Sequence, residues 1–209
     1  MKLDILACKI FIATFMSNVA YGIIAPIVPI IFKQKGVPLN AVALIFAAYS
    51  VSMIIVSPIV PFLMRKSGQQ FVIKTGLLLF GICLICFGTV QYMHRTSLIV
   101  AYSTFLRALQ GVCSALIQTS CYAVAANHYP DDKEEVIGYL EAIMGIGNGL
   151  GPFLGALLYT LFGFDIAFYT FGATLILFVI VTQIVSQSSS TPKEKENNDF
   201  QAVEPTLTN

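Results

Sequence analysis

Arg107 is the residue whose type and position in this sequence most strongly indicate chemistry. The 11 residues before it and the 23 residues between it and Asp131 carry no charge. If this uncharged stretch is a transmembrane helix that begins near Leu98, Arg107 lies about 14 Å deep, close to the bilayer midplane. A charge at that depth costs about 2.5 to 3.5 kcal/mol on insertion scales, so the side chain should face protein or a water-filled cavity.

Polar residues follow Arg107 along one face of the same helix. At about 100° per residue, five of them fall within roughly 60° of a line through Arg107. These residues are Gln110, Gly111, Ser114, Gln118 and Tyr122. We predict that this stripe lines a cavity; the alternative is a helix-packing face held together by polar side chains.

Glu141 is the acidic residue that matches Arg107. It stands about six residues beyond Glu135, or about 9 Å into the fifth predicted span, and Gly145, Asn148 and Pro152 share its helix face at i+4, i+7 and i+11. If it is buried, it is the natural partner of Arg107. The alternative is a carboxylate at the headgroup boundary that continues an acidic first turn.

That acidic turn marks the start of a helix. Asp131 and Asp132 are candidate N-caps, and Glu134 and Glu135 follow them three residues later, in capping-box register. We therefore interpret these four acids as structural.

Six uncharged stretches of 20 to 29 residues run through the sequence, and each can cross a bilayer as a helix. With 56% apolar residues, 11% charged residues and a mean hydropathy of +0.79, the chain has too little polar surface for a soluble globule. The apolar runs do not alternate with polar residues, which favours helices over a barrel. The predicted spans are residues 10–32, 41–64, 75–93, 98–126, 136–159 and 166–185. A signal peptide over the first run is the alternative there, but that run continues to Phe32 and five more follow.

The ends of the chain and the loops predict the topology. Residues 186–209 are polar and rich in serine, so we predict a six-helix transmembrane domain over 1–185 and a disordered cytoplasmic tail or linker over 186–209. One side of the membrane would collect eight basic residues and the other side three. Because the richer side is normally cytoplasmic, both termini are expected in the cytoplasm of a multi-pass membrane protein.

Gly147, Gly151 and Gly155 repeat every fourth residue in the fifth span. One face of that helix is therefore nearly smooth and needs a partner helix that packs closely against it. Pro152 cannot donate to the helix ladder and should bend the helix.

Several of these residues carry a resemblance to the major facilitator superfamily. Its fifth-helix antiporter motif is matched by Gly138, Gly147, Gly151, Pro152 and Gly155, and only Ala156 departs from it. The sequence from Arg107 to Gly111 resembles the R-x-x-Q-G motif of the fourth helix. The loop motif G-x-x-x-D-R/K-x-G is degraded, since Pro61 replaces its glycine and Arg65 its acid, although Lys66 and Gly68 remain.

Other segments resemble one branch of that superfamily. Asn18, Tyr21 and Gly22, with Pro26 and Pro29, look like its first helix. Together with Tyr-Pro-Asp-Asp at 129–132, they are most similar to vesicular amine transporters and related multidrug antiporters.

The resemblance implies a fold of two six-helix halves that rock about a substrate site near the membrane midplane. This all-α chain would be the first half, and its glycine face would pack against the missing C-terminal half or a second copy. The implied function is secondary transport, namely proton-coupled antiport of an organic cation or another small solute. Arg107 and Glu141 would couple protons to transport. The candidate cavity-lining residues are Asn18, Tyr21, Gln110, Ser114, Gln118 and Asn148.

The alternative function is a half-length, non-transporting membrane protein that binds and regulates a partner transporter. A membrane enzyme is not expected, because no nucleophile, base and orienting group converge at membrane depth. Cys83 and Cys86 have the spacing of a metal or redox pair, but they lie in an apolar run with no second pair nearby. We therefore predict no metal, no cofactor and no nucleic-acid partner; the expected partners are the small-molecule substrate, protons and the lipid bilayer.

Overall fold

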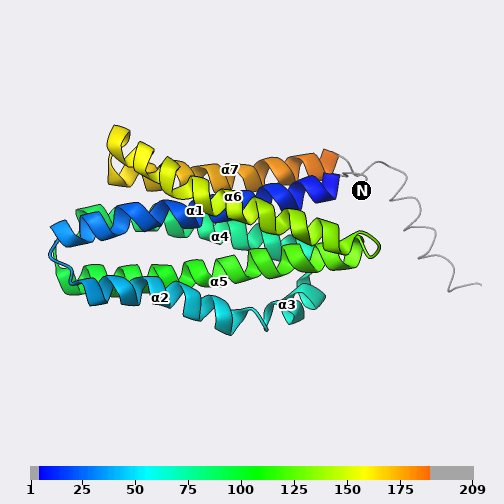
Figure 1. The fold of residues 1–209 in the computed structure, drawn as a ribbon, viewed down its shortest axis with the longest axis horizontal. Coiled ribbons are helices and arrows are strands. Elements are labelled where there is room, and N and C mark those ends of the chain that lie inside the picture. Colours follow the sequence, from blue (N-terminus) through cyan, green and yellow to red (C-terminus); the bar gives the residue numbers. More distant parts are fainter. Residues whose placement is uncertain (1–4, 189–209) are drawn as a thin grey trace, which may run out of the picture.

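The computed structural model describes residues 5–188 as a bundle of helices that run roughly parallel to one another (Figure 1). The elements are α1 (Ile5–Gln34), α2 (Leu39–Val56), α3 (Val60–Ser67), α4 (Gln69–Gly88), η1 (Thr89–Tyr92), α5 (Thr96–His128), α6 (Lys133–Phe162) and α7 (Phe164–Ser188). Among the described residues, six helices are long and apolar enough to cross a membrane. The six predicted spans are therefore confirmed, five of them with ends shifted by a few residues.

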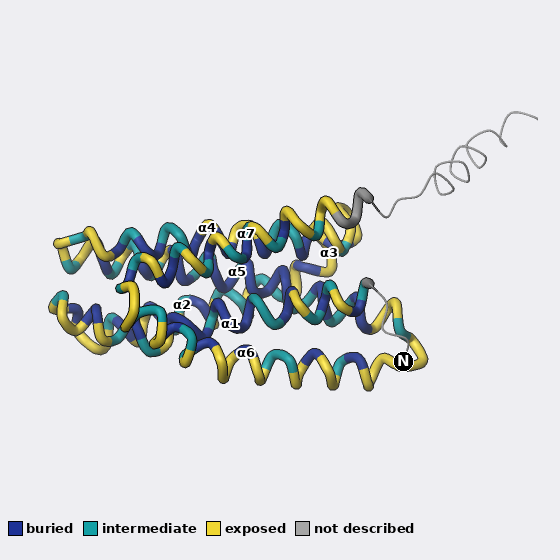
Figure 2. Tube along the Cα trace, turned by 90° about the horizontal axis from the view of Figure 1, so that it is seen from above, coloured by how far each residue is buried: buried dark blue, intermediate teal, exposed yellow. Residues whose placement is uncertain are grey.

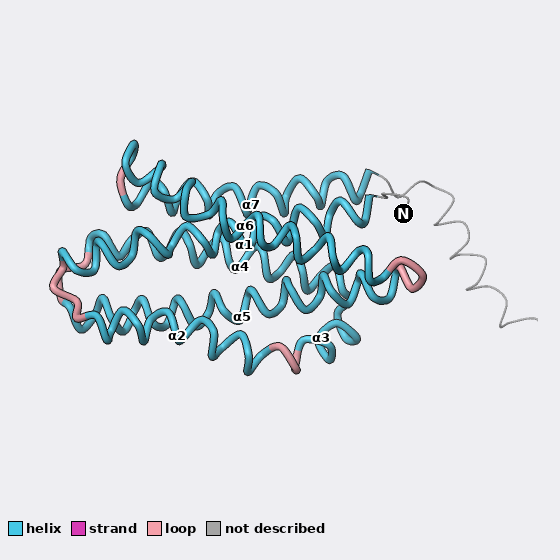
Figure 3. Tube along the Cα trace, viewed as in Figure 1, coloured by secondary structure: helices cyan, strands magenta, loops and turns pink. Residues whose placement is uncertain are grey.

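The second span is shorter than predicted. We expected one helix over 41–64, but α2 ends at Val56 and a short non-helical link separates it from α3 (Figure 3). Pro58 has no backbone N–H for the helix ladder, and Pro61 sits in the first turn of α3, where proline favours a helix start. The apolar residues continue on both sides of this link, so the sequence pattern did not predict the break. α3 is held to the bundle by Val60 and Met64, which are both buried.

The start of α6 differs in detail from the expected capping box. Asp132 is the N-cap residue, but its side chain makes no capping hydrogen bond. Its backbone has φ −109° and ψ 16°, away from the extended geometry that normally aims an N-cap side chain at the first turn. Glu134 and Glu135 do lie in the first turn, where the helix dipole favours negative charge. The predicted tail lies outside the described residues from position 189 onward, and its first three residues continue α7.

The bundle is built from four closely packed pairs of helices. α1 packs against α6, α2 against α5, and α4 against both α7 and α5. α1, α4 and α5 contribute most of the core, since at least half of their most apolar stretches is buried, against 17% for α2 and for α6. Figure 2 shows the same contrast for α6, where exposed positions recur along the whole length of the helix.

The glycine face of α6 has its partner within this chain. A Cβ atom at Gly147 would lie 3.0 Å from Asn18 Cβ, and one at Gly151 would lie 2.7 Å from the Val19 carbonyl oxygen. A Cβ atom at Gly155 would lie 2.9 Å from Ile23 Cα. α1 therefore covers this face, which corrects the expectation that it would wait for the missing half.

Of the two other residues of the fifth-helix motif, Pro152 contacts α1 and Gly138 does not. Pro152 takes part in the contact between α1 and α6, because its Cδ lies 2.9 Å from a Cβ placed at Gly22. Gly138 does not take part, since a Cβ placed there would meet nothing within 4 Å.

Candidate functional site

Arg107 is fully buried in the first half of α5, with α1 and α2 beside it. Its guanidinium carbon lies 4.5 Å from the ring centroid of Tyr49, 5.2 Å from that of Phe46 and 5.4 Å from that of Tyr21. We call these three rings the aromatic cage. Their faces attract the cation and offset part of the cost of removing it from water. The cage explains how the chain holds a charge at this depth.

The cage leaves several donors of the site unused. Arg107 Nη1 donates a hydrogen bond to Gln110 Oε1 at 3.0 Å. Within the described residues, the buried Arg107 Nε and Nη2 and Gln110 Nε2 have no partner. An unsatisfied buried donor costs about 1 to 3 kcal/mol, more if it is charged. The site is therefore rich in donors and short of acceptors, so it suits water or an acceptor group of a ligand.

The polar stripe continues from the cage along α5. Tyr49 Oη donates to Ser114 Oγ at 2.7 Å, and Gln118 Nε2 donates to the same oxygen at 3.2 Å. Ser114 is buried and Gln118 is half-buried. These hydrogen bonds make this part of the predicted stripe a polar contact between α2 and α5.

Gly111 lets α2 approach α5 closely enough to form the cage. A Cβ atom there would overlap the Tyr49 carbonyl and the Ser52 hydroxyl. Ser52 Oγ also donates to the Ala108 carbonyl at 2.7 Å, which ties the two helices together. The glycine four residues after Arg107 therefore positions an aromatic ring against the guanidinium.

Not all of the predicted cavity residues meet at this site. Tyr21, Gln110, Ser114 and Gln118 gather around Arg107 or along the stripe, whereas Asn18 is buried against Gly147. Asn18 Nδ2 donates to the Thr14 carbonyl of its own helix at 2.8 Å. Asn148 is exposed on α6.

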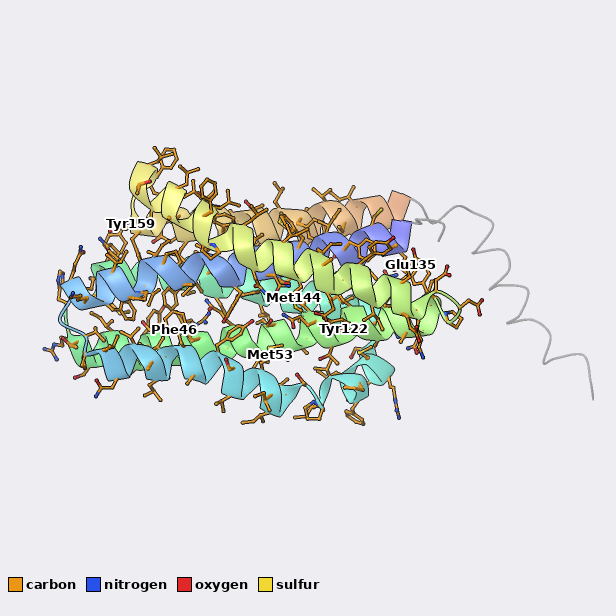
Figure 4. All side chains as sticks on the ribbon, in the orientation of Figure 1. Phe46, Met53, Tyr122, Glu135, Met144 and Tyr159 are labelled. Atoms are coloured by element: carbon orange, nitrogen blue, oxygen red, sulfur yellow. The ribbon has the colours of Figure 1, made fainter. Side chains whose placement is uncertain are left out.

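Arg107 and Glu141 are not brought together. Glu141 is exposed on α6, and its Oε1 accepts a hydrogen bond from Tyr122 Oη at 2.6 Å. Tyr122 follows Arg107 by 15 residues on α5, which separates them by about 22 Å along the helix. Figure 4 shows Tyr122 and the cage residue Phe46 well apart along the bundle. The chain therefore presents two separate polar centres.

Sequence reasoning missed the part of the site contributed by α2. Phe46 and Tyr49 are three residues apart and therefore share a helix face. A buried arginine with no acid in its own span needs aromatic or polar neighbours, and this i, i+3 pair was the available signal. No group of three or more histidine, cysteine, aspartate or glutamate side chains in the described part of the chain could hold a metal ion.

Comparisons with known proteins agree with the fold. The chain is 26% identical over 163 residues to the human MFS-type transporter SLC18B1, which covers 78% of this chain and 36% of that protein. Its identity to the rat SLC18B1 is 24% over 177 residues, covering 85% of this chain and 39% of that protein.

The quinolone resistance protein NorA of Staphylococcus aureus (strain MRSA252) is 27% identical over 194 residues, which cover 92% of this chain and 47% of NorA. The chain thus spans less than half the length of these relatives. The sequence also matches the family description Major Facilitator Superfamily over residues 10–208. This match covers nearly the whole chain, which therefore belongs to the major facilitator superfamily and is an integral, multi-pass membrane protein.

Proposed function

We propose that this chain is the N-terminal half of a proton-coupled antiporter that exchanges protons for an organic cation or another small solute. The observation that carries the proposal is the buried Arg107 in its aromatic cage, with Nε and Nη2 unpaired in the described part of the chain. Packing alone does not account for this arrangement, because leucine or glutamine would fill the position without the insertion cost of a charge.

In this proposal Arg107 organises the hydrogen-bond network of the transport pathway. Its free donors bind water or an acceptor group of the substrate, and the cage holds the guanidinium in place. Tyr49, Ser114 and Gln118 extend that network along α5 through hydrogen bonds of 2.7 and 3.2 Å.

Glu141 is the proposed exchanging group. Its carboxylate is exposed on this half and keeps one hydrogen bond from Tyr122, so it remains open to a second partner. A proton or an organic cation neutralises the same negative charge, and the two therefore compete for it. This competition is the physical basis of exchange, because release of one occupant lets the other bind.

The other half of the pathway would come from the remaining length of the protein or from a second copy. α2 and α6 are the least covered spans of the described chain, and they carry exposed apolar side chains such as Ile54, Leu150 and Phe153. Rocking of the second half against this surface would expose Glu141 to each side of the membrane in turn. The regulatory alternative has no support from the relatives above, two of which are named as transporters.

The test is uptake of a fluorescent organic cation into vesicles that contain the protein, with and without an imposed proton gradient. If the protein exchanges protons for the cation, a vesicle with an acidic lumen should accumulate the fluorescent cation as protons leave. A protonophore should abolish this accumulation. Equal accumulation of the cation with and without the proton gradient would contradict proton coupling. No accumulation under either condition would contradict an organic-cation substrate.

A further inference from the structure

A small cavity at one end of the bundle is separate from Arg107 and Glu141. It lies between α1, α4, α5 and α7 and has a volume of about 40 Å³. A water molecule needs roughly 10 to 15 Å³ by this measure, so the enclosed space fits about three waters or a short apolar segment of similar size. Its walls are mostly apolar and include Ile10, Ala13, Ile73, Leu77, Val124 and Phe178.

Two lysines line this apolar cavity from different helices. Lys9 comes from α1 and Lys74 from α4, and both side chains are half-buried. Neither has a hydrogen bond or an ion pair in the described part of the chain. Lys35, by contrast, donates to the carbonyls of Gln91 and Met93 at 2.6 and 2.8 Å. Two like charges at one apolar cavity repel each other and lose hydration, and an anion between them relieves both costs.

The cavity is polar at its mouth and apolar inside. Lys9 and Lys74 lie four and five residues from the first described residues of α1 and α4, so they are about 6 to 8 Å from the helix ends. Ala13 and Leu77, one turn further along the same helices, lie deeper. α7 runs towards this end, and its Thr182 is therefore nearer the mouth than Phe178.

This order matches the boundary between headgroups and acyl chains in a bilayer. The hydrocarbon core begins within about one turn or two of the ends of a spanning helix. Lysines at that level reach the phosphate layer with their flexible stems, and anionic lipids gather beside basic residues on the cytoplasmic side.

We propose that this cavity binds an anionic phospholipid. The lipid phosphate would sit between the ammonium groups of Lys9 and Lys74. The adjoining part of one acyl chain would pack against Ala13, Leu77 and Phe178, and the remainder would continue into the bilayer. The site depends neither on the transported substrate nor on coupling at Glu141.

The experiment measures lipid binding by the full chain purified in a neutral detergent. Phosphatidylglycerol and phosphatidylcholine with identical acyl chains are titrated separately, and Kd is read from native mass spectrometry and from thermal stabilisation. We expect phosphatidylglycerol to bind more tightly. In Lys9→Ala/Lys74→Ala its Kd should rise about 30-fold, since each lysine near the membrane surface contributes about 1 kcal/mol and 1.4 kcal/mol is tenfold.

Two matched variants make the result specific. Arg65→Ala/Lys66→Ala also removes two exposed positive charges, from the end of α3 outside the cavity, and should leave the Kd within about twofold. Lys9→Arg/Lys74→Arg keeps the charge and should retain tight binding. An equal loss in the α3 variant would mean general surface attraction and would overturn the proposal, as would unchanged binding in the alanine variant.

Inorganic phosphate and glycerol 3-phosphate form the third arm of the experiment. The lipid proposal expects no thermal stabilisation from either compound at concentrations where phosphatidylglycerol saturates the site. Neither compound has an acyl chain that could contact the apolar wall of the cavity. Full stabilisation by free phosphate, lost in the alanine variant, would identify a soluble-anion site and would contradict the proposal.

Discussion

The guanidinium of Arg107 is stabilised by aromatic faces instead of a carboxylate. Cation–π contacts of this kind contribute about 0.5 to 2 kcal/mol, with the larger values at desolvated sites. They place no fixed negative charge beside the cation. Arg107 therefore remains a positively charged donor without an acidic partner. In our proposal the negative charge that takes part in exchange is the carboxylate of Glu141.

Arg107→Lys is expected to abolish most transport while leaving membrane insertion normal. Lysine keeps the charge but loses the planar five-donor fork, which stacks on Tyr49 and reaches Gln110. A transport barrier raised by about 1.4 kcal/mol or more would lower uptake at least about tenfold. Uptake of a fluorescent cation, normalised to the amount of inserted protein, measures this. Arg95→Lys is the matched control, since Arg95 is exposed at the start of α5; equal uptake by both variants would contradict the role of Arg107.

Glu141→Gln is expected to flatten the pH dependence of exchange more than it weakens substrate binding. The amide still accepts the hydrogen bond from Tyr122, but it cannot carry a proton. Proton-driven uptake at several pH values, compared with binding at one fixed pH, separates the two effects.

The same helix supplies an internal control for that substitution. Glu135 is also exposed and accepts a hydrogen bond at 3.1 Å from a tyrosine, Tyr139. Glu135→Gln should keep the full pH response of exchange. A full pH response in Glu141→Gln, or its loss in Glu135→Gln, would show that the coupling carboxylate has been placed wrongly.

At the scale of elements, the closely packed helix pairs approach each other most closely at glycines. Close approach of backbones compensates for the absence of a hydrophobic driving force between helices in lipid. Among the glycines of α6, Gly147, Gly151 and Gly155 lie against α1, whereas a Cβ at Gly145 or Gly149 would meet nothing within 4 Å. The glycines of α6 therefore fall into two groups, those that pack against α1 and those with no neighbour beside the Cβ position.

Gly151→Ala is expected to destabilise the contact between α1 and α6. The new methyl group would lie 2.7 Å from the Val19 carbonyl, and overpacking of this kind costs about 1 to 3 kcal/mol. For a chain of this size we expect Tm in detergent to fall by roughly 2 to 10 °C. Gly149→Ala is the control on the same helix, and it should leave Tm unchanged or raise it slightly because alanine favours helix. Equal Tm values for the two variants would remove the assigned packing role of Gly151.

The spans could be predicted from sequence because bilayer thickness fixes the length of a spanning helix and the cost of charge in lipid keeps charged residues out of it. The break at Pro58 was missed, since apolar residues continue on both sides of it and a hydropathy pattern ignores backbone donors. The partner of the glycine face and the contribution of Phe46 and Tyr49 depend on which helices are neighbours. Sequence periodicity assigns residues to a face, but it does not say which helix covers that face.

At the scale of the whole molecule, coverage is uneven among the six spans. α1, α4 and α5 bury half or more of their most apolar stretches inside the chain, while α2 and α6 bury 17% each. These two exposed helices pack against α5 and α1, the helices that carry Arg107 and Tyr21. The polar site therefore lies beside the least covered helices, where in our proposal a second half would complete it.

The orientation of the whole bundle in the membrane is the last prediction, and it depends on the eight-to-three distribution of basic residues. Lys66 lies in the last turn of α3, Lys133 begins α6, and Arg95 precedes α5 at the opposite end of the bundle (Figure 1). All three side chains are exposed and therefore accessible to reagents. In a background with the five native cysteines replaced, Lys66→Cys and Lys133→Cys should react with a membrane-impermeant maleimide only from the cytoplasmic side. Arg95→Cys should react only from the other side, because the short loop before α5 is then extracytoplasmic. The reverse labelling pattern would invert the topology, and it would also move Lys9 and Lys74 to the leaflet with fewer anionic lipids.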